Sequence, residues 1–295
     1  MTLPYKRLFV KLKFTRERYS MYSDILLCVD FDRTLTALDG SIPERNLEAI
    51  RYFIAHGGKF TVNTGRTYVS FNPFLETVPI NAPLLLMNGS GSWENGVFSD
   101  MVPLEIDAWA VVRQLQQQFD GVNFELQTLD VHYLVDPTDA YRAYYLRRGL
   151  PHEIADPARH TGPFLKIGIY GDTEHREEGS EAVTKAAMFD RIEAILNQQL
   201  DDSLVVLRAT PQIINVHASA ASKLNAARNL QKKLGRKILV CVGDEGNDIP
   251  MLRGADFAFC PSDGAVAAEF TNVCPCSQGA VADVIYNEIP KILRG

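Results

Sequence analysis

The sequence has no excess of positive charge and no repeated or low-complexity segment. Its 36 acidic residues outnumber its 30 basic ones, so the net charge is −6. A chain with this charge has no general basic field that would attract nucleic acid or an anionic membrane. The six histidines lack the spacing of a metal triad or a hydrolase triad. We therefore expect no nucleic-acid partner, and the positive charge that an anionic substrate needs has to be supplied locally.

Long apolar runs are also missing, and cysteines are few. No stretch approaches the length of a membrane-spanning helix, so we expect no membrane partner. The five cysteines are odd in number, and Cys28 and Cys241 fall within expected core strands, which fits reduced thiols in the cytoplasm. The pair Cys274 and Cys276 lacks the spacing of a zinc site. The sequence therefore predicts an ordinary cytoplasmic globular protein, as a monomer or homodimer.

The first twenty residues carry six basic side chains against Glu17 alone, interleaved with apolar ones. A secretory signal needs an unbroken apolar segment, and charge interrupts it here. We interpret residues 1–22 as an N-terminal extension that precedes the fold. The alternative is an arm that binds a membrane surface or a partner.

Two carboxylates follow a short apolar run near the start of the expected fold. The run 25–29 has the length and residue types of a buried central strand. In an extended chain residues i and i+2 point to the same side, so Asp30 and Asp32 begin by facing one spot beyond the strand. Like charges this close repel unless a cation lies between them or one keeps its proton. The alternative is an ordinary solvated junction between a strand and a loop.

Polar clusters also follow two other strand-like runs. The run 59–62 ends at Asn63-Thr64-Gly65-Arg66, and the run 238–242 ends at Gly243-Asp244-Glu245-Gly246-Asn247-Asp248. Between these clusters, Lys223 lies at the start of a helical pattern. In open parallel sheets, ligands bind beyond the carboxyl ends of the strands, where clusters of this kind would meet.

With these four motifs in order, the chain from about Asp24 to the C-terminus resembles the haloacid dehalogenase (HAD) superfamily of phosphohydrolases. The resemblance is specifically to its Cof-type sugar-phosphatase branch. It implies a HAD-like Rossmannoid core with a large cap inserted after the third strand.

The chain pattern fits this organisation. Strands and helices alternate from residue 25 to residue 87, including a helix expected over 67–76, which predicts a doubly wound parallel sheet. The pattern then changes, because Asn95-Gly96 is typical of an antiparallel hairpin. We expect a core domain formed by 23–88 and 212–295, with an α+β cap domain over 89–211 inserted into it.

The resemblance also implies roles for the motif residues. Asp30 would attack phosphorus and form an aspartyl-phosphate, and Asp32 would serve as general acid and base. Mg²⁺ would be bound by Asp30, the backbone carbonyl of Asp32 and Asp244, with Asp248 as a further ligand or a neighbour of the ligands. The residues expected to bind the substrate are Thr64, Gly65, Arg66, Lys223 and Asn247.

Each assignment has an alternative. Thr64 could be the N-cap of the next helix, Lys223 a solvated surface lysine, and 243–246 a plain turn. Arg66 either binds substrate or pairs with a core carboxylate. The family commonly has glycine after its second aspartate, where this chain has Arg33, so the loop is expected to differ in shape or to place a cation near the leaving group.

The expected function is Mg²⁺-dependent hydrolysis of a small phosphorylated metabolite, with sugar phosphates as the expected substrates. The cap would close over the site and contact the leaving group. The alternatives are a phosphotransferase of the phosphomannomutase type and a non-catalytic sensor of sugar phosphates. Candidates for specificity residues are Asn88, His132, Arg147 and Arg148.

Overall fold

The structure is a computed structural model that describes residues 21–171 and 180–294. The expected N-terminal extension therefore lies outside the described residues, apart from its last two. The chain forms two compact units. The core unit contains the described residues of 1–65, 74–97 and 222–295, and the cap unit contains those of 66–73 and 98–221.

The core unit is built on a five-stranded sheet in the order β14-β13-β12-β1-β2, in which all neighbours are parallel. Its central strand β1 is buried along its whole length, as its unbroken apolar sequence predicts. The bounds of the strands are β1 Ile25–Val29, β2 Lys59–Val62, β12 Ile238–Val242, β13 Phe257–Pro261 and β14 Thr271–Val273.

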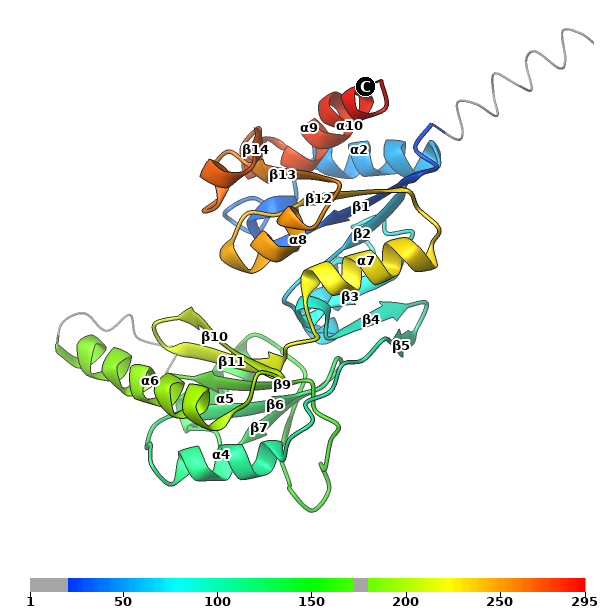
Figure 1. The fold of residues 1–295 in the computed structure, drawn as a ribbon. Helices are drawn as coiled ribbons and strands as arrows, with labels where there is room; N and C mark the ends of the chain where they lie inside the picture. The colour runs from blue at the N-terminus through cyan, green and yellow to red at the C-terminus, as the bar shows by residue number, and fades with distance from the viewer. Residues whose placement is uncertain (1–20, 172–179, 295) are drawn as a thin grey trace, which may run out of the picture. The chain divides into compact units, whose positions relative to one another are not determined.

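Helices cover both faces of this sheet (Figure 1). On one face, α7 (Lys223–Lys233) and α8 (Ile249–Arg253) pack against apolar side chains of β1 and β12. On the other face lie α2 (Glu44–Ala55), α9 (Ala280–Asp283) and α10 (Ile289–Ile292). This two-sided burial explains why β1 and β12 are apolar at every position and do not alternate.

The third strand of the chain, β3, belongs to a smaller antiparallel sheet in the order β3-β4-β5. Its strands are β3 Leu84–Leu86, β4 Gly91–Glu94 and β5 Val97–Ser99. Asn95 and Gly96 between β4 and β5 both have positive φ, as the tight Asn-Gly turn requires. The expected hairpin is therefore present.

The cap unit contains a six-stranded sheet in the order β10-β11-β9-β6-β7-β8. All its neighbouring strands are antiparallel except β7 and β8. The bounds are β6 Asn123–Gln127, β7 His132–Val135, β8 His152–Ile154, β9 Lys166–Tyr170, β10 Leu204–Thr210 and β11 Ile213–Ala218. Strand β11 continues this sheet beyond residue 211, the last residue that the sequence assigned to the cap.

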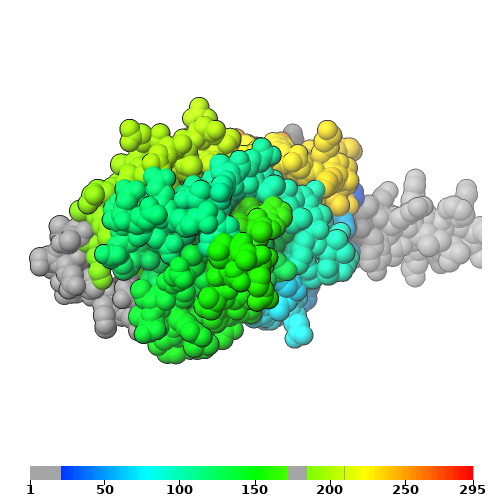
Figure 2. Space-filling model, turned by 90° about the horizontal axis from the view of Figure 1, so that it is seen from below, coloured from blue at the N-terminus to red at the C-terminus, as the bar shows by residue number. Residues whose placement is uncertain are grey.

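The two faces of the cap sheet differ in chemistry. One face is apolar and packs with α4 (Ala108–Gln116) and α6 (Ser180–Gln199) in a single hydrophobic cluster. The opposite face carries polar side chains, and α5 (Asp139–Arg147) contributes Tyr141 and Tyr145 to a small cluster there with Leu134. In the space-filling view, the green segments between α4 and β9 form much of the visible cap surface (Figure 2).

The expected fold class, a doubly wound parallel sheet with an α+β cap, is confirmed. The helix expected over 67–76 is wrong in length, because α3 spans only Tyr68–Phe71 and a single 3₁₀ turn follows it. Pro73 lies in that turn and has no amide hydrogen to continue the helix. Among the described residues, no helix is long and apolar enough to cross a membrane.

Gly89 provides a test of the core packing. It has a φ of +91°, and a Cβ atom there would lie 2.4 Å from the Ser222 carbonyl oxygen. Gly40 has a similar φ of +82° but open space around it. We expect Gly40→Ala to lower the unfolding free energy by about 1 kcal/mol through backbone strain alone. We expect Gly89→Ala to cost about 2 kcal/mol more, because the backbone has to shift. Urea unfolding measures both, and equal losses would contradict the packing described here.

Candidate active site

The polar ends of β1, β2 and β12 meet at one edge of the core sheet. The amide of Asp30 donates to the Val242 carbonyl over 2.9 Å, and the amide of Asn63 donates to the Val29 carbonyl over 2.8 Å. Parallel pairing in register therefore brings together segments that are far apart in the sequence. Asp30 and the cluster 243–248 lie at neighbouring strand ends, as the motif positions predict.

Lys223 joins two of these carboxylates. It is the first residue of α7, where the Ser222 hydroxyl caps the helix by accepting from the Asn225 amide. Its ammonium lies 2.5 Å from Asp30 Oδ1 and 2.6 Å from Asp248 Oδ1. With 2% exposure, Lys223 is not the solvated surface lysine of the alternative interpretation.

The loop after β12 is fixed by its own carboxylate. Asp248 Oδ2 accepts hydrogen bonds from the amides of Asp244 at 3.0 Å and Glu245 at 3.1 Å. The Thr34 hydroxyl donates to Asp244 Oδ1 over 2.8 Å and so orients that side chain. The sequence pattern alone does not reveal this role of Thr34, although a hydroxyl two residues beyond Asp32 is a signal for it.

The three aspartates form a crowded anionic site. Asp30, Asp244 and Asp248 are buried, and each offers a carboxylate oxygen within 4.8 Å of the others. Burial raises the pKa of Asp30 to about 8, with Lys223 opposing and Asp248 adding to the effect. Burial likewise raises the pKa of Asp244 to about 6, against the hydrogen bond from Thr34.

The donor set fits a divalent cation. With all three carboxylates ionised, as metal ligation requires, and one ammonium beside them, the site has a charge of −2, which one divalent ion balances. Asp244 Oδ2 is buried and has no hydrogen-bond partner among the described residues, so it has an unused pair of electrons for a ligand. Carboxylate oxygens are the donors that Mg²⁺ prefers. Asp30, Asp244 and Asp248 are therefore the residues that would bind it.

Asn88 and Asn247 lie beside the loop after β2. Thr64 is fully buried, and its amide donates to the Leu85 carbonyl over 3.0 Å. A Cβ atom on Gly65 would come within 3.2 Å of Asn88 Oδ1, which also accepts from Asn247 Nδ2 at 3.3 Å. Two expected substrate-binding residues, Gly65 and Asn247, thus lie next to the same amide side chain.

Arg33 keeps the backbone shape that glycine would give. Its φ of 61° lies in the left-handed region, so the loop bends as a glycine loop would, at some conformational cost. Its guanidinium lies 3.0 Å from Glu245 Oε1 and 3.9 Å from Asp244 Oδ2. The preceding Asp32 is exposed to solvent. The guanidinium of Arg33, which follows β1, therefore lies against the loop after β12 that carries Asp244.

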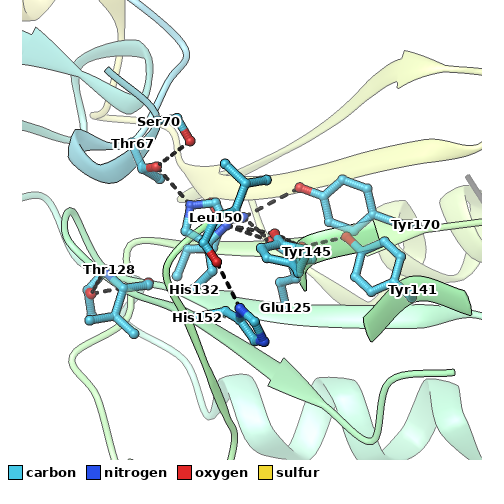
Figure 3. A network of polar contacts seen from close by, with 12 residues as sticks. Thr67, Ser70, Glu125, Thr128, His132, Tyr141, Tyr145, Leu150, His152 and Tyr170 are labelled. Carbon is cyan, nitrogen blue, oxygen red and sulfur yellow. Dashed lines mark hydrogen bonds and ion pairs between the residues drawn. The ribbon is translucent and has the colours of Figure 1, made fainter. Parts of the chain in front are cut away.

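Arg66 belongs to the cap unit, whereas the carboxylates belong to the core unit. Its guanidinium donates to the Ser70 carbonyl over 3.1 Å. The adjoining Thr67 hydroxyl bonds to His132 Nε2 at 2.7 Å, which ties the segment after the second motif to the cap sheet (Figure 3). His132, a specificity candidate from the sequence, is thus part of a buried network.

Glu125 lies at the centre of that network (Figure 3). Its carboxylate accepts from the hydroxyls of Tyr141 and Tyr145 and from Gln127 Nε2. His132 Nδ1 lies 3.4 Å from Glu125 Oε2 and 2.8 Å from the Tyr145 hydroxyl. Burial acts to raise the pKa of Glu125, but the contacts with His132 and the tyrosines outweigh it and lower the pKa.

Comparison with known proteins agrees with this geometry. The model of the haloacid dehalogenase-like hydrolases matches residues 27–269. This match covers most of the chain, which therefore belongs to the haloacid dehalogenase-like hydrolase family. The resemblance inferred from the four motifs is confirmed.

Individual relatives are distant in sequence. A protein of Bacillus subtilis named 5-amino-6-(5-phospho-D-ribitylamino)uracil phosphatase is 24% identical over 234 residues, which cover 78% of this chain and 80% of that protein. A haloacid dehalogenase-like hydrolase from Bacteroides thetaiotaomicron has a TM-score of 0.74 at 18% identity, covering 90% of this chain and 98% of its own. A subclass IIB sugar phosphatase has a TM-score of 0.68 at 17% identity, covering 88% and 97%. The expected enzyme class, a HAD-type phosphatase, is confirmed by the family and these names.

The three buried carboxylates predict a stabilising response to Mg²⁺. At about one hundred times its Kd, the ion should raise the thermal midpoint by about 5 °C, because it binds the folded site and neutralises the repulsion there. Asp244→Asn should abolish most of this shift, and Asp39→Asn, at an exposed loop position, should keep it. Differential scanning calorimetry measures the shift, and an undiminished response of Asp244→Asn would refute the ligand assignment.

The Glu125 network predicts a stability effect within the cap. Tyr145→Phe removes a donor to a buried carboxylate and should lower the unfolding free energy by about 1.5–3 kcal/mol. Tyr144→Phe is the matched control, because its hydroxyl forms no hydrogen bond with a described residue. Urea unfolding of the two variants at pH 7 gives the comparison. Similar losses in both would contradict the network.

The loss of unfolding free energy in Tyr145→Phe, relative to wild type, is expected to depend on pH. The folded pKa of Glu125 is lowered, so its stabilising contribution is complete above its ordinary value of 4.5. The contribution is lost as the pH falls through the folded pKa. The stability difference between wild type and Tyr145→Phe should therefore shrink in acid, and a difference that grows below that pH would reverse the assignment.

Proposed function

We propose that the protein is a Mg²⁺-dependent phosphomonoester hydrolase that acts on small phosphorylated metabolites, with sugar phosphates as the preferred class. The observation that carries this proposal is the buried Asp30 carboxylate, bonded to Lys223 beside Asp244 and Asp248. A nucleophile that is bonded to a buried ammonium and lies beside two further carboxylates able to bind a metal suits phosphoryl transfer better than a structural ion pair.

Charge neutralisation is the first requirement of the reaction. A phosphate ester is anionic and repels an attacking carboxylate, so the site needs positive charge before Asp30 can approach. Lys223 supplies one positive charge to the transferring group from the start of α7. When bound, Mg²⁺ supplies further charge compensation and orients phosphate oxygens.

Asp30 is the nucleophile in this proposal. Lys223 binds Oδ1 and favours the ionised carboxylate, which leaves Oδ2 to attack phosphorus. A bond forms between Oδ2 and phosphorus while the bond to the leaving alkoxide breaks, giving an aspartyl-phosphate. The Thr64 hydroxyl and the backbone at Gly65 would bind phosphoryl oxygens, and Asn247 would orient the phosphate or the lysine.

Asp32 transfers the protons. It would donate one to the leaving oxygen, and then accept one from the water that attacks the aspartyl-phosphate, releasing inorganic phosphate and restoring both carboxyl groups. Its exposed position gives it contact with water, which the second half of this cycle requires. That exposure favours hydrolysis over a phosphotransferase of the phosphomannomutase type. The complete set of Asp30, Lys223 and Asp244 argues against a non-catalytic sensor.

The preference for sugar phosphates rests on relatives and not on the core site. A similar solved structure is named a sugar phosphatase, and a curated relative is named for a substrate with a phosphorylated ribityl chain. All free cysteines in the described chain are buried or half-buried thiols, which fits the reducing cytoplasm that we propose as its location.

The decisive experiment measures phosphate release from a panel of phosphorylated metabolites, with and without EDTA. We expect Mg²⁺-dependent release from sugar phosphates, and Asp30→Asn should lower kcat by at least about 10³-fold by removing the nucleophile. Circular dichroism should show that the variant is folded, and Asp39→Asn should retain normal activity. Normal turnover by Asp30→Asn, or turnover insensitive to EDTA, would refute the mechanism.

A further inference from the structure

The polar face of the cap sheet carries a row of side chains that the proposed chemistry does not use. Gln127 on β6 pairs directly with Lys166 on β9, and Lys166 pairs directly with His217 on β11. Side chains opposite each other on adjacent strands lie about 5 Å apart at Cβ and share one face. Glu125 and Asn215 lie two residues from Gln127 and His217, so they belong to the same face.

Two amide oxygens on this face lack partners. Gln127 is 1% exposed, and its Oε1 has no hydrogen bond among the described residues. Its orientation is set by chemistry, because Nε2 donates to the Glu125 carboxylate, which can only accept. Asn215 Oδ1 is likewise buried and unbonded within the described chain. A buried acceptor without a donor is destabilising, and a ligand that donates a hydrogen bond to it would recover this loss.

Lys166 and His217 complete the set. No described residue forms a hydrogen bond or ion pair with the half-buried Lys166 ammonium. Burial lowers the pKa of Lys166, and the Glu125 charge partly opposes this. Burial also lowers the pKa of His217, so its ring is neutral at pH 7. His217 Nδ1 bonds to the Ala218 carbonyl at 3.1 Å and must be the donor, which leaves Nε2 as an acceptor.

The row therefore offers three acceptors and one cationic donor, and the Tyr170 hydroxyl, 3.4 Å from Gln127 Nε2, lies on the same face. Phosphate and carboxylate groups have few or no donors at neutral pH, so an anion would satisfy Lys166 alone and would be repelled by Glu125. A hydroxyl group both donates and accepts, and adjacent hydroxyls could satisfy the amide oxygens, the imidazole and the ammonium together. We propose that Gln127, Lys166, Asn215 and His217 form a binding site for a polyhydroxylated ligand.

Two sources supply this chemistry. One is the polyol part of the substrate itself, and this case rests on the proposed function. The other is a free polyol that binds the cap without being a substrate. The two cases differ in whether turnover of a phosphorylated polyol depends on Lys166, so they can be separated by kinetics.

The kinetic arm compares D-glucose 6-phosphate and ribitol 5-phosphate with phenyl phosphate, an ester without hydroxyl groups. Lys166→Met should raise KM for the two polyol esters by about tenfold, because a hydrogen bond from a charged donor is lost. KM for phenyl phosphate and kcat should stay unchanged. Lys166→Arg should retain much of the polyol preference, and Lys237→Met, at an exposed lysine of the core unit, should behave as wild type.

The binding arm needs no turnover, so it tests the site even if the protein is not a phosphatase. Free D-glucose and ribitol are titrated into the full chain and into Lys166→Met, with saturation-transfer NMR as the readout. Binding that is lost in the variant, with unchanged KM values, would support the site with a free polyol as ligand. Thermal unfolding of each variant confirms that it is folded.

Two results would overturn the proposal. The first is polyol binding and polyol-ester KM values that are both the same in wild type and Lys166→Met. The second is an equal rise in KM for phenyl phosphate and the polyol esters, because Lys166 would then act on the phosphoryl group or on the fold, and not on hydroxyl groups.

Discussion

The buried ion pairs of Lys223 with Asp30 and Asp248 are the interaction on which the rest of the core site depends. They connect the end of β1, the start of α7 and the loop after β12, which come from three separate parts of the chain. Removing one partner of a buried pair leaves an uncompensated charge and typically costs about 3–5 kcal/mol. The same contacts order the site and keep three carboxylates close to a single ammonium, so the site has an excess of negative charge. Structural order and the excess of negative charge therefore have a common origin here.

The cap separates stability from recognition by using the two faces of one sheet. Its apolar face packs with α4 and α6 and supplies the hydrophobic core of that unit. Its other face is thereby free to carry polar groups, some bonded within the Glu125 network and some without partners. Because side chains alternate along each strand, a change of residues on the polar face need not disturb the core. Such a surface can change its ligand while the fold is kept.

The sequence predicted the parts of the site that lie directly at strand ends. Asp30 and Asp244 follow buried strands, and parallel pairing places their positions together whatever the side chains do. The contacts of Thr34 and Asn88 could not be predicted from the sequence. They depend on the directions of side chains that are more than 150 residues apart in the chain. In the cap, α5 was missed, since its tyrosines pack on a polar sheet face and give a weak apolar period. The sequence also could not show that Arg66 groups with the cap unit, because sequence order does not reveal to which unit a loop residue belongs.

The pairing of β1 with β12 has a consequence for how the protein is made. Ile25 lies opposite Ile238, so the central strands of the core can meet only after more than 200 residues have followed the first of them. The β-strands of the cap all lie between these two in the sequence, and their partners are complete by residue 218. During synthesis the inserted unit can therefore close its sheet first, while the edge of β1 that pairs with β12 stays uncovered. A nascent chain that stops before β12 has every cap strand but only part of the acidic cluster, because Asp244 and Asp248 follow β12.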